Sequence, residues 1–394
     1  MADRSPERLK AAPQAAPQGI FLARPEHPGE GIPLAVKDLF DTAGLTTTYG
    51  SIVYAEHVPD RTAEAVSRLE AAGYANVGKT NLHEFAYGIT SANPHFGTVP
   101  NPAFPGRMAG GSSGGSAAAL AAALADAALG TDSGGSIRIP AACCGIVGFK
   151  PSFGLVSLEG VFPLAPSFDH VGPMARTVGG CTGMLQVLAD GFEPVPLESL
   201  EEVEVGIAWL ELADPLVRAR VRAAAELFPR RRELDFPLAE EIGPVFMREV
   251  ADVHGELFAE FADSYGENVR TKIERCLAVT DAEYERGLRI RADYRERAQQ
   301  AIEGVDLVLT PTLGFVAPKL PVDDLEIRVR TIRLTYPFNA LGWPALALPA
   351  GPAEDGLAAS VQLAAPAGRD ALVLAVGALL EHELHASVSE ILSR

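Results

Sequence analysis

The stretch GGSSGGSAAALAAALADAALGTDSGGSIRIP, residues 110–140, decides how this chain is interpreted. Two clusters of glycine and serine flank an alanine-rich segment; the first holds Ser112 and Ser113, and the second ends at Ser136. Glycine allows backbone conformations that other residues avoid, and successive N–H groups in such a turn form an anion site. A serine there would lie beside donors able to stabilise the oxyanion of a tetrahedral intermediate. For one cluster alone, a flexible loop is the better interpretation; two clusters around one helix favour a catalytic site.

Strand-like and helical segments alternate around this stretch. We predict strands over 31–40, 74–80, 129–131 and 145–149, and helices over 62–72 and 116–128. A charge-rich region follows at 190–300, with a helix from 281 to 303. Strand-like segments return at 306–311, 344–350 and 360–365, and a last helix is predicted over 370–385. This alternation predicts one α/β domain, with a large mixed, mostly parallel β-sheet covered by helices on both faces.

We expect the chain to divide into a flexible N-terminal lead-in, 1–30, and a single domain, 31–394. Within that domain, 30–180 is expected to be the catalytic core, 190–300 a variable segment on the substrate side, and 301–394 the closing strands and helix.

Composition narrows the classes of partner. The 33 basic and 51 acidic residues give a net charge of −18, so we expect neither nucleic acid nor an anionic membrane as a partner. The 4 cysteines fit neither a disulfide framework nor a zinc pattern, and we expect reduced thiols. The first 18 residues lack the apolar stretch of a signal peptide. These features together predict a soluble cytoplasmic protein.

A nucleophilic serine needs a base. The chain has 8 histidines, but none stands in a motif that pairs it with a serine. Lys37 lies in the apolar run GIPLAVKDLF, 31–40, and complete burial lowers the pKa of a lysine by up to about 3–5. Asp38 should point to the opposite face of the strand and should therefore not neutralise Lys37 directly. From composition alone, an ordinary lysine at a strand end is the better interpretation.

The chain resembles the amidase signature family. The matching stretches are GIPLAVKD (31–38), VGKTNLHEFAYG (77–88), GGSSGGSAAA (110–119), GTDSGGSIRIPAACCGIVGFKPS (130–152) and SFDHVGPMART (167–177), with weaker matches at 306–312 and 337–351. The resemblance implies a triad of Lys37, Ser112 and Ser136, with Ser112 on a cis peptide bond and Ser136 as the nucleophile. It covers residues 30–180 densely and 190–300 thinly.

The resemblance also implies the surroundings of the triad. Backbone N–H groups of Ser133, Gly134, Gly135 and Ser136 would form the oxyanion hole, and Ser133 stands where threonine is commoner in the family. The supporting residue Ser113 would orient Lys37 by a hydrogen bond.

A substrate pocket is expected at Tyr87, Gly88 and Ile89. The implied enzyme is a linear amide hydrolase that acts through an acyl-enzyme on the C–N bond of a small neutral amide. It would need no metal and no organic cofactor, and it could form a homodimer. Two alternatives stay open: a glutaminase-type subunit of an amidotransferase complex, or the same hydrolase acting mainly on carbamates or esters.

Three other patterns have weaker interpretations. GYANVGKT, 73–80, satisfies the P-loop expression, but a helix precedes it and strand-like residues fill it, so we expect no nucleotide site. Cys143 and Cys144 lie in an apolar stretch and are expected to be structural. Arg138 could bind a substrate carboxylate, although a structural role is the better interpretation.

Overall fold

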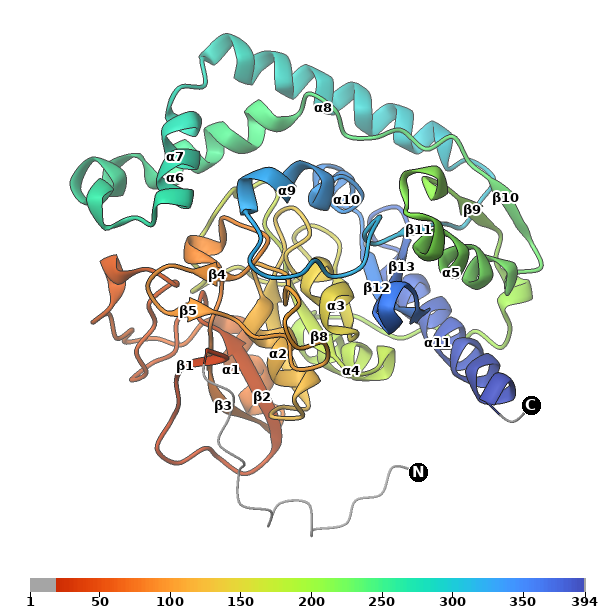
Figure 1. The fold of residues 1–394 in the computed structure, drawn as a ribbon, viewed down its shortest axis with the longest axis horizontal. Helices are drawn as coiled ribbons and strands as arrows, with labels where there is room; N and C mark the ends of the chain where they lie inside the picture. Colours follow the sequence, from red (N-terminus) through yellow and green to blue (C-terminus); the bar gives the residue numbers. More distant parts are fainter. Residues whose placement is uncertain (1–18, 393–394) are drawn as a thin grey trace.

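An 11-stranded sheet runs through the computed structural model, which describes residues 19–392 (Figure 1). From edge to edge its strands are β1 (Phe21–Ala23), β3 (Tyr74–Thr80), β2 (Ile32–Lys37), β6 (Ala127–Thr131), β8 (Val171–Ala175), β7 (Val147–Lys150), β12 (Ala345–Pro352), β13 (Ala358–Ala364), β11 (Leu307–Pro311), β9 (Val205–Ile207) and β10 (Arg231–Glu233). A separate pair, β4 (Ala92–Asn93) and β5 (Gly97–Thr98), lies outside this sheet. The predicted single α/β domain with a large mixed sheet is confirmed.

Parallel pairing is confined to two blocks of this sheet. β2 pairs in parallel with β3 and β6, and β9 pairs in parallel with β10 and β11. The strands between the blocks pair antiparallel, as β12 and β13 do. A helix links β2 to β3, which allows a parallel crossover, whereas a short turn links β12 to β13 and dictates a hairpin.

Helices cover both faces of the sheet, as predicted. One face carries α1 (Glu64–Ala71), α4 (Val178–Leu188), α5 (Pro215–Glu226) and α11 (Asp370–Leu392), and the other carries α2 (Gly114–Ala121) and α3 (Arg138–Cys144). Side chains alternate along β2: Leu34 and Val36 pack with the first group of helices, and Ala35 packs with the second.

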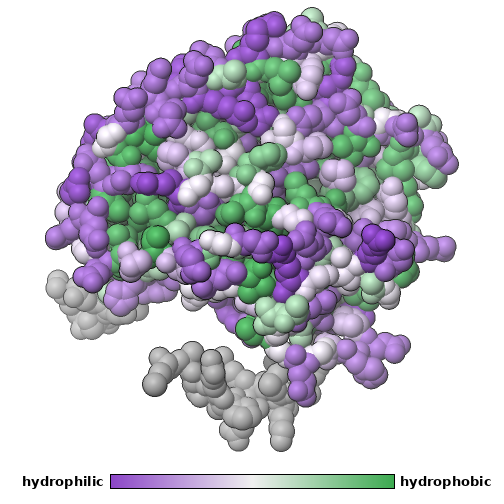
Figure 2. Space-filling model, turned by 180° about the vertical axis from the view of Figure 1, so that it is seen from behind, coloured by the Kyte–Doolittle hydropathy of each residue, from purple (hydrophilic) through white to green (hydrophobic). Residues whose placement is uncertain are grey.

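A further helical layer arches over the α2–α3 side (Figure 1). It consists of α6 (Gly243–Phe261), α7 (Glu267–Leu277) and α8 (Asp281–Ala301), with α9 (Asp324–Ile332) and α10 (Tyr336–Leu341) below it. Hydrophilic side chains cover the top of the molecule, where α8 runs (Figure 2). Short 3-10 helices lie at Ile52–Tyr54, Glu84–Ala86, Leu200–Glu202, Leu210–Leu212, Ala262–Ser264 and Glu354–Gly356.

Two expectations from the sequence are corrected here. The helix predicted over 116–128 begins at Gly114 and ends at Ala121, and the chain turns at Ala123, whose φ is 55°, before it enters β6. Within the predicted lead-in, Phe21–Ala23 forms the edge strand β1, because its backbone pairs with β3. Residues 1–18 of that lead-in lie outside the described residues. Within 19–392 we find no helix with the length and apolar character that crossing a membrane requires.

Candidate active site

Lys37 ends β2 in the interior of the protein, with 0% of its surface exposed. Its Nζ donates hydrogen bonds of 2.7 Å to the hydroxyls of Ser112 and Thr131. Burial lowers the pKa of Lys37 to about 7, against the opposing pull of the Asp132 and Asp169 carboxylates. A substantial share of this amine is therefore neutral near neutral pH, which is the condition for a lysine to accept a proton.

The neighbouring Asp38 faces away from Lys37, as predicted. It forms a buried ion pair with Lys79, with 3.1 Å between Lys79 Nζ and Asp38 Oδ1. Lys79 also donates to the Phe40 carbonyl and to the Thr47 hydroxyl. Lys79 belongs to the strand β3 and is 0% exposed, so the P-loop expression around it corresponds to no phosphate-binding turn.

Ser112 and Ser113 lie in the turn before α2. Ser112 follows a cis Gly111–Ser112 peptide bond, as the resemblance implied. Ser113 was expected to form a hydrogen bond with Lys37, and this expectation is wrong. Its hydroxyl instead donates to the carbonyl of Thr131 and accepts from the N–H of Thr131. Thr131 itself accepts the second hydrogen bond from Lys37. Sequence reasoning missed Thr131, whose position at the end of the neighbouring parallel strand was the signal available.

Ser136 lies in the turn between β6 and α3. The N–H of Ser113 donates to the Ser136 carbonyl at 3.2 Å, which joins the two Gly/Ser turns. Ser136 is 7% exposed, whereas Ser112 is 0% exposed, so Ser136 is the more accessible of the two hydroxyls. Among the described residues, no hydrogen bond joins the hydroxyl of Ser136 to that of Ser112 or to any histidine.

The four N–H groups expected to form the oxyanion hole are not equivalent. The N–H of Gly135 donates to Asp132 Oδ1 at 2.7 Å. It is therefore already engaged and does not belong to the oxyanion hole in the way expected from the sequence. Those of Ser133, Gly134 and Ser136 have no hydrogen-bond acceptor within the described part of the chain. Gly135 has a φ of +128° and an added Cβ would lie 2.3 Å from Thr335 Oγ1, so only glycine fits this turn.

Arg138 packs against this turn and is 0% exposed. Its guanidinium pairs with the Asp132 carboxylate at 2.9 Å and also donates to Gln362, Asn339 and the Thr335 carbonyl. Burial by itself would raise the pKa of Asp132, but the charges of Arg138 and Lys150 and the hydrogen bonds from Arg138 and Asn339 together keep the pKa well below its usual range. With its donors engaged in this way, Arg138 is structural, as the better interpretation of the sequence held.

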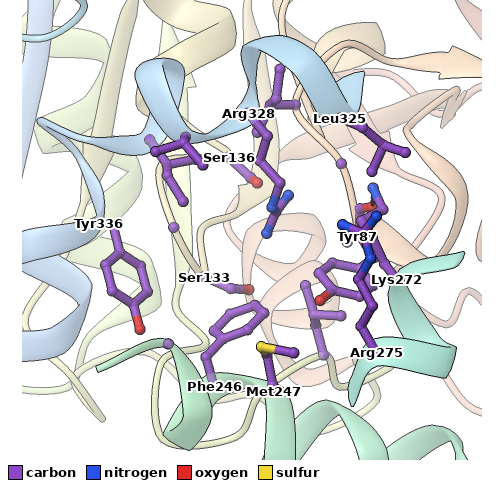
Figure 3. A pocket seen from close by; sticks show the side chains of 18 of the residues that line it. Tyr87, Ser133, Ser136, Phe246, Met247, Lys272, Arg275, Leu325, Arg328 and Tyr336 are labelled. Atoms are coloured by element: carbon purple, nitrogen blue, oxygen red, sulfur yellow. Dashed lines mark hydrogen bonds between the residues drawn. The ribbon is translucent and has the colours of Figure 1, made fainter. Parts of the chain in front are cut away.

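A pocket of about 540 Å³ opens beside this turn (Figure 3). Ser133, Gly134 and Ser136 line it, and so do all three residues of the predicted substrate segment, Tyr87, Gly88 and Ile89. The 190–300 region contributes further lining residues, which are Ala239, Glu241, Gly243, Pro244, Phe246, Met247, Lys272 and Arg275. Helix α9 adds others, including Leu325 and Arg328.

Three cationic side chains in this pocket were missed by sequence reasoning: Lys272, Arg275 and Arg328. They come from α7 and α9, more than 130 residues from Ser136 in the chain, and no local motif marks them. Their position is therefore a property of the folded chain.

The remaining candidates are structural. All four cysteines are buried and unpaired, and burial raises the pKa of Cys143 to about 12, which disfavours a thiolate. Among residues 19–392, no group of three or more His, Cys, Asp and Glu side chains is placed to hold a metal ion.

The sequence and the fold are both similar to those of known proteins. The sequence matches the family model described as Amidase over residues 4–196 and 192–374. It is 35% identical to one subunit of the glutamyl-tRNA(Gln) amidotransferase from Synechococcus sp. (strain RCC307), over 94% of this chain and 87% of that protein. It is also 35% identical to an amidase from Pseudomonas putida, over 94% of this chain and 85% of that one. A solved amidase structure superposes with a TM-score of 0.83 at 38% identity, over 90% of this chain and 85% of the other.

Proposed function

Because this chain belongs to the amidase family of hydrolases, we propose that it hydrolyses small amides through an acyl-enzyme formed on Ser136. Neutral Lys37 accepts the proton of Ser112, and Ser112 accepts that of Ser136. Ser136 Oγ then bonds to the carbonyl carbon, and the C–N bond breaks as the proton returns through Ser112 to the leaving amine. Water hydrolyses the acyl-enzyme by the same relay.

The observation that carries the proposal is the 2.7 Å hydrogen bond from a fully buried Lys37 to Ser112. The next residue, Ser113, donates its N–H to the Ser136 carbonyl and so joins the two turns. The relay needs the Ser136 hydroxyl to rotate toward Ser112. It is free to do so because it has no other hydrogen-bond partner within the described residues. The unpartnered N–H groups of Ser133, Gly134 and Ser136 are the donors available to the oxyanion.

The leaving-group side is assigned to the 190–300 region. This assignment is supported by the residues of α6 and α7 that line the pocket opposite the Ser136 turn. The cytoplasmic location is supported by four buried, unpaired cysteines, which are typical of a reducing compartment. A homodimer stays a prediction, and sedimentation of the purified protein would measure it.

The experiment is a hydrolysis panel of aryl amides, aliphatic amides, esters and carbamates. Wild type, Ser136→Ala and Ser112→Ala are compared, with Ser157→Ala as a matched control because Ser157 lies outside the pocket. We expect both triad variants to lose amide turnover and the control to keep it. Substantial turnover by Ser136→Ala would refute the nucleophile, and a preference for esters or carbamates would identify the alternative substrate class.

A second candidate is a glutaminase-type subunit of an amidotransferase complex, which the similarity to the Synechococcus protein favours. Such a subunit passes ammonia to a companion protein. Copurification of a stable partner from the native host, together with glutamine hydrolysis that the partner stimulates, would favour it over a free hydrolase.

A further inference from the structure

The charge of the pocket differs in sign from that of the whole chain. The protein carries a net charge of −18, yet Lys272, Arg275 and Arg328 all line the cavity beside Ser136. The side chains of Arg275 and Arg328 approach the pocket from α7 and α9 (Figure 3). The acidic side chain in the lining is Glu241, which forms an ion pair with Arg286.

The three cations have different surroundings. Lys272 is buried and pairs with the Asp324 carboxylate at 2.9 Å, so its charge is compensated within the protein. Arg328 lies over the Tyr87 ring, 5.0 Å from its centroid. Within residues 19–392, neither Arg275 nor Arg328 has a carboxylate at ion-pair distance or an acceptor for its guanidinium donors.

Neighbouring arginines on the same helices show the contrast. Arg330 on α9 pairs with Asp214 at 2.9 Å, and Arg270 on α7 lies 4.0 Å from Asp263. Neither Arg330 nor Arg270 lines the pocket. On each helix, therefore, the arginine that faces the pocket has no carboxylate at ion-pair distance, although its neighbour has one. The charge of Arg328 acts at longer range on the Asp324 carboxylate, which pairs directly with Lys272.

We propose that Arg275 and Arg328 select amide substrates that carry a carboxylate. A guanidinium offers planar paired donors that match a carboxylate, and such bonds are stronger than neutral ones. The Tyr87 ring holds the Arg328 side chain at the wall, and the apolar lining of Ile89, Phe246 and Met247 suits a short hydrocarbon link between carboxylate and amide. This inference rests on the proposed function and replaces the neutral substrate expected from the sequence.

The test uses pairs of substrates in which a carboxylate is replaced by an uncharged carboxamide. Succinamate and glutaramate carry a carboxylate on the acyl side, and succinamide and glutaramide are their neutral counterparts. N-acyl amino acids and the matching N-acyl amino acid amides place the same difference on the leaving-group side. In at least one series, we expect the anionic member to have a kcat/KM higher by about tenfold or more.

The variants locate the preference. Arg328→Gln and Arg275→Gln should each lower kcat/KM for the anionic member, mainly through KM, by about tenfold. Each variant should lower kcat/KM less for the neutral member, so the ratio of the anionic to the neutral kcat/KM should fall. Arg330→Gln and Arg270→Gln remove the same charge from the same helices and should leave the preference unchanged.

Failure of this inference is distinguishable from failure of the proposed function. If neutral amides are hydrolysed in a Ser136-dependent way and neither series shows a carboxylate preference, the inference is overturned and the proposed function stands. If no amide is hydrolysed, binding of succinamate and N-acyl amino acids to Ser136→Ala is measured by calorimetry. Binding that the Arg275 and Arg328 variants weaken supports the inference, and binding of both members with equal affinity, or no binding, overturns it.

Discussion

Replacing Lys37 with arginine tests the neutral amine directly. Arginine keeps the positive charge and the hydrogen-bond donors but does not deprotonate in proteins. Burial takes the pKa of Lys37 from its ordinary 10.5 to about 7. At about 1.4 kcal/mol per pH unit, that difference is a penalty of about 5 kcal/mol against the charged form.

The activity follows from the neutral fraction. With a pKa of about 7, about a tenth of Lys37 is neutral at pH 6 and about nine-tenths at pH 8. We expect kcat/KM for an uncharged amide to rise about tenfold per pH unit below this pKa and to level off above it. Lys37→Arg should be slower by about 10²–10⁴-fold at every pH, as for loss of a general base.

Stability gives an independent measure of the same penalty. The folded-state pKa lies below the unfolded one, so the unfolded chain binds more protons between pH 7 and 10.5. The burial cost is therefore full below pH 7 and falls as the pH rises to 10.5. Lys37→Met removes this burial cost. The variant should therefore gain more stability relative to wild type at pH 6 than at pH 10, by at most about 5 kcal/mol.

The assays are a pH–rate series from 5.5 to 10 and urea unfolding at pH 6 and pH 10. Folding of each variant is checked by circular dichroism before rates are compared. Lys37→Arg activity within tenfold of wild type, or a profile with no acidic limb, would refute the reasoning.

Three further perturbations have defined outcomes. Thr131→Val removes one acceptor of Lys37 and should lower kcat about tenfold with little change in KM, whereas Thr131→Ser should restore it; equal rates for both variants would contradict this positioning role. Asp169→Asn removes a carboxylate that raises the pKa of Lys37, so the acidic limb of kcat/KM should move to lower pH, and a move to higher pH would contradict the assignment. Asp38→Asn removes the buried carboxylate that pairs with Lys79 and should lower the free energy of unfolding in urea by about 3 kcal/mol. A loss below about 1 kcal/mol would show that the ion pair contributes little to stability.

Parts of this site could be predicted because local sequence determines them. The apolar run around Lys37 predicts a buried strand, and alternation along that strand correctly turns Asp38 away. The two Gly/Ser clusters predict tight turns on either side of a helix. The predicted end of that helix was wrong: the helix ends at Ala121 because the chain turns at Ala123, and the alanine run gives no sign of that turn.

Other parts depend on contacts between distant segments. Thr131 reaches Lys37 because β6 pairs with β2, and the Asp132 carboxylate occupies the Gly135 N–H because Arg138 holds it in place. The pocket cations come from helices that are remote in the sequence, so the neutral substrate expected from the core motifs took no account of Arg275 and Arg328.

Covalent trapping tests the assigned nucleophile most directly. The protein is incubated with a fluorophosphonate or an activated carbamate, and intact mass and peptide mapping locate the adduct. We predict one adduct per chain on Ser136, formed faster as the pH rises through about 7, and none in Ser136→Ala. Labelling at another residue, or an unchanged rate of labelling in Ser136→Ala, would contradict the account.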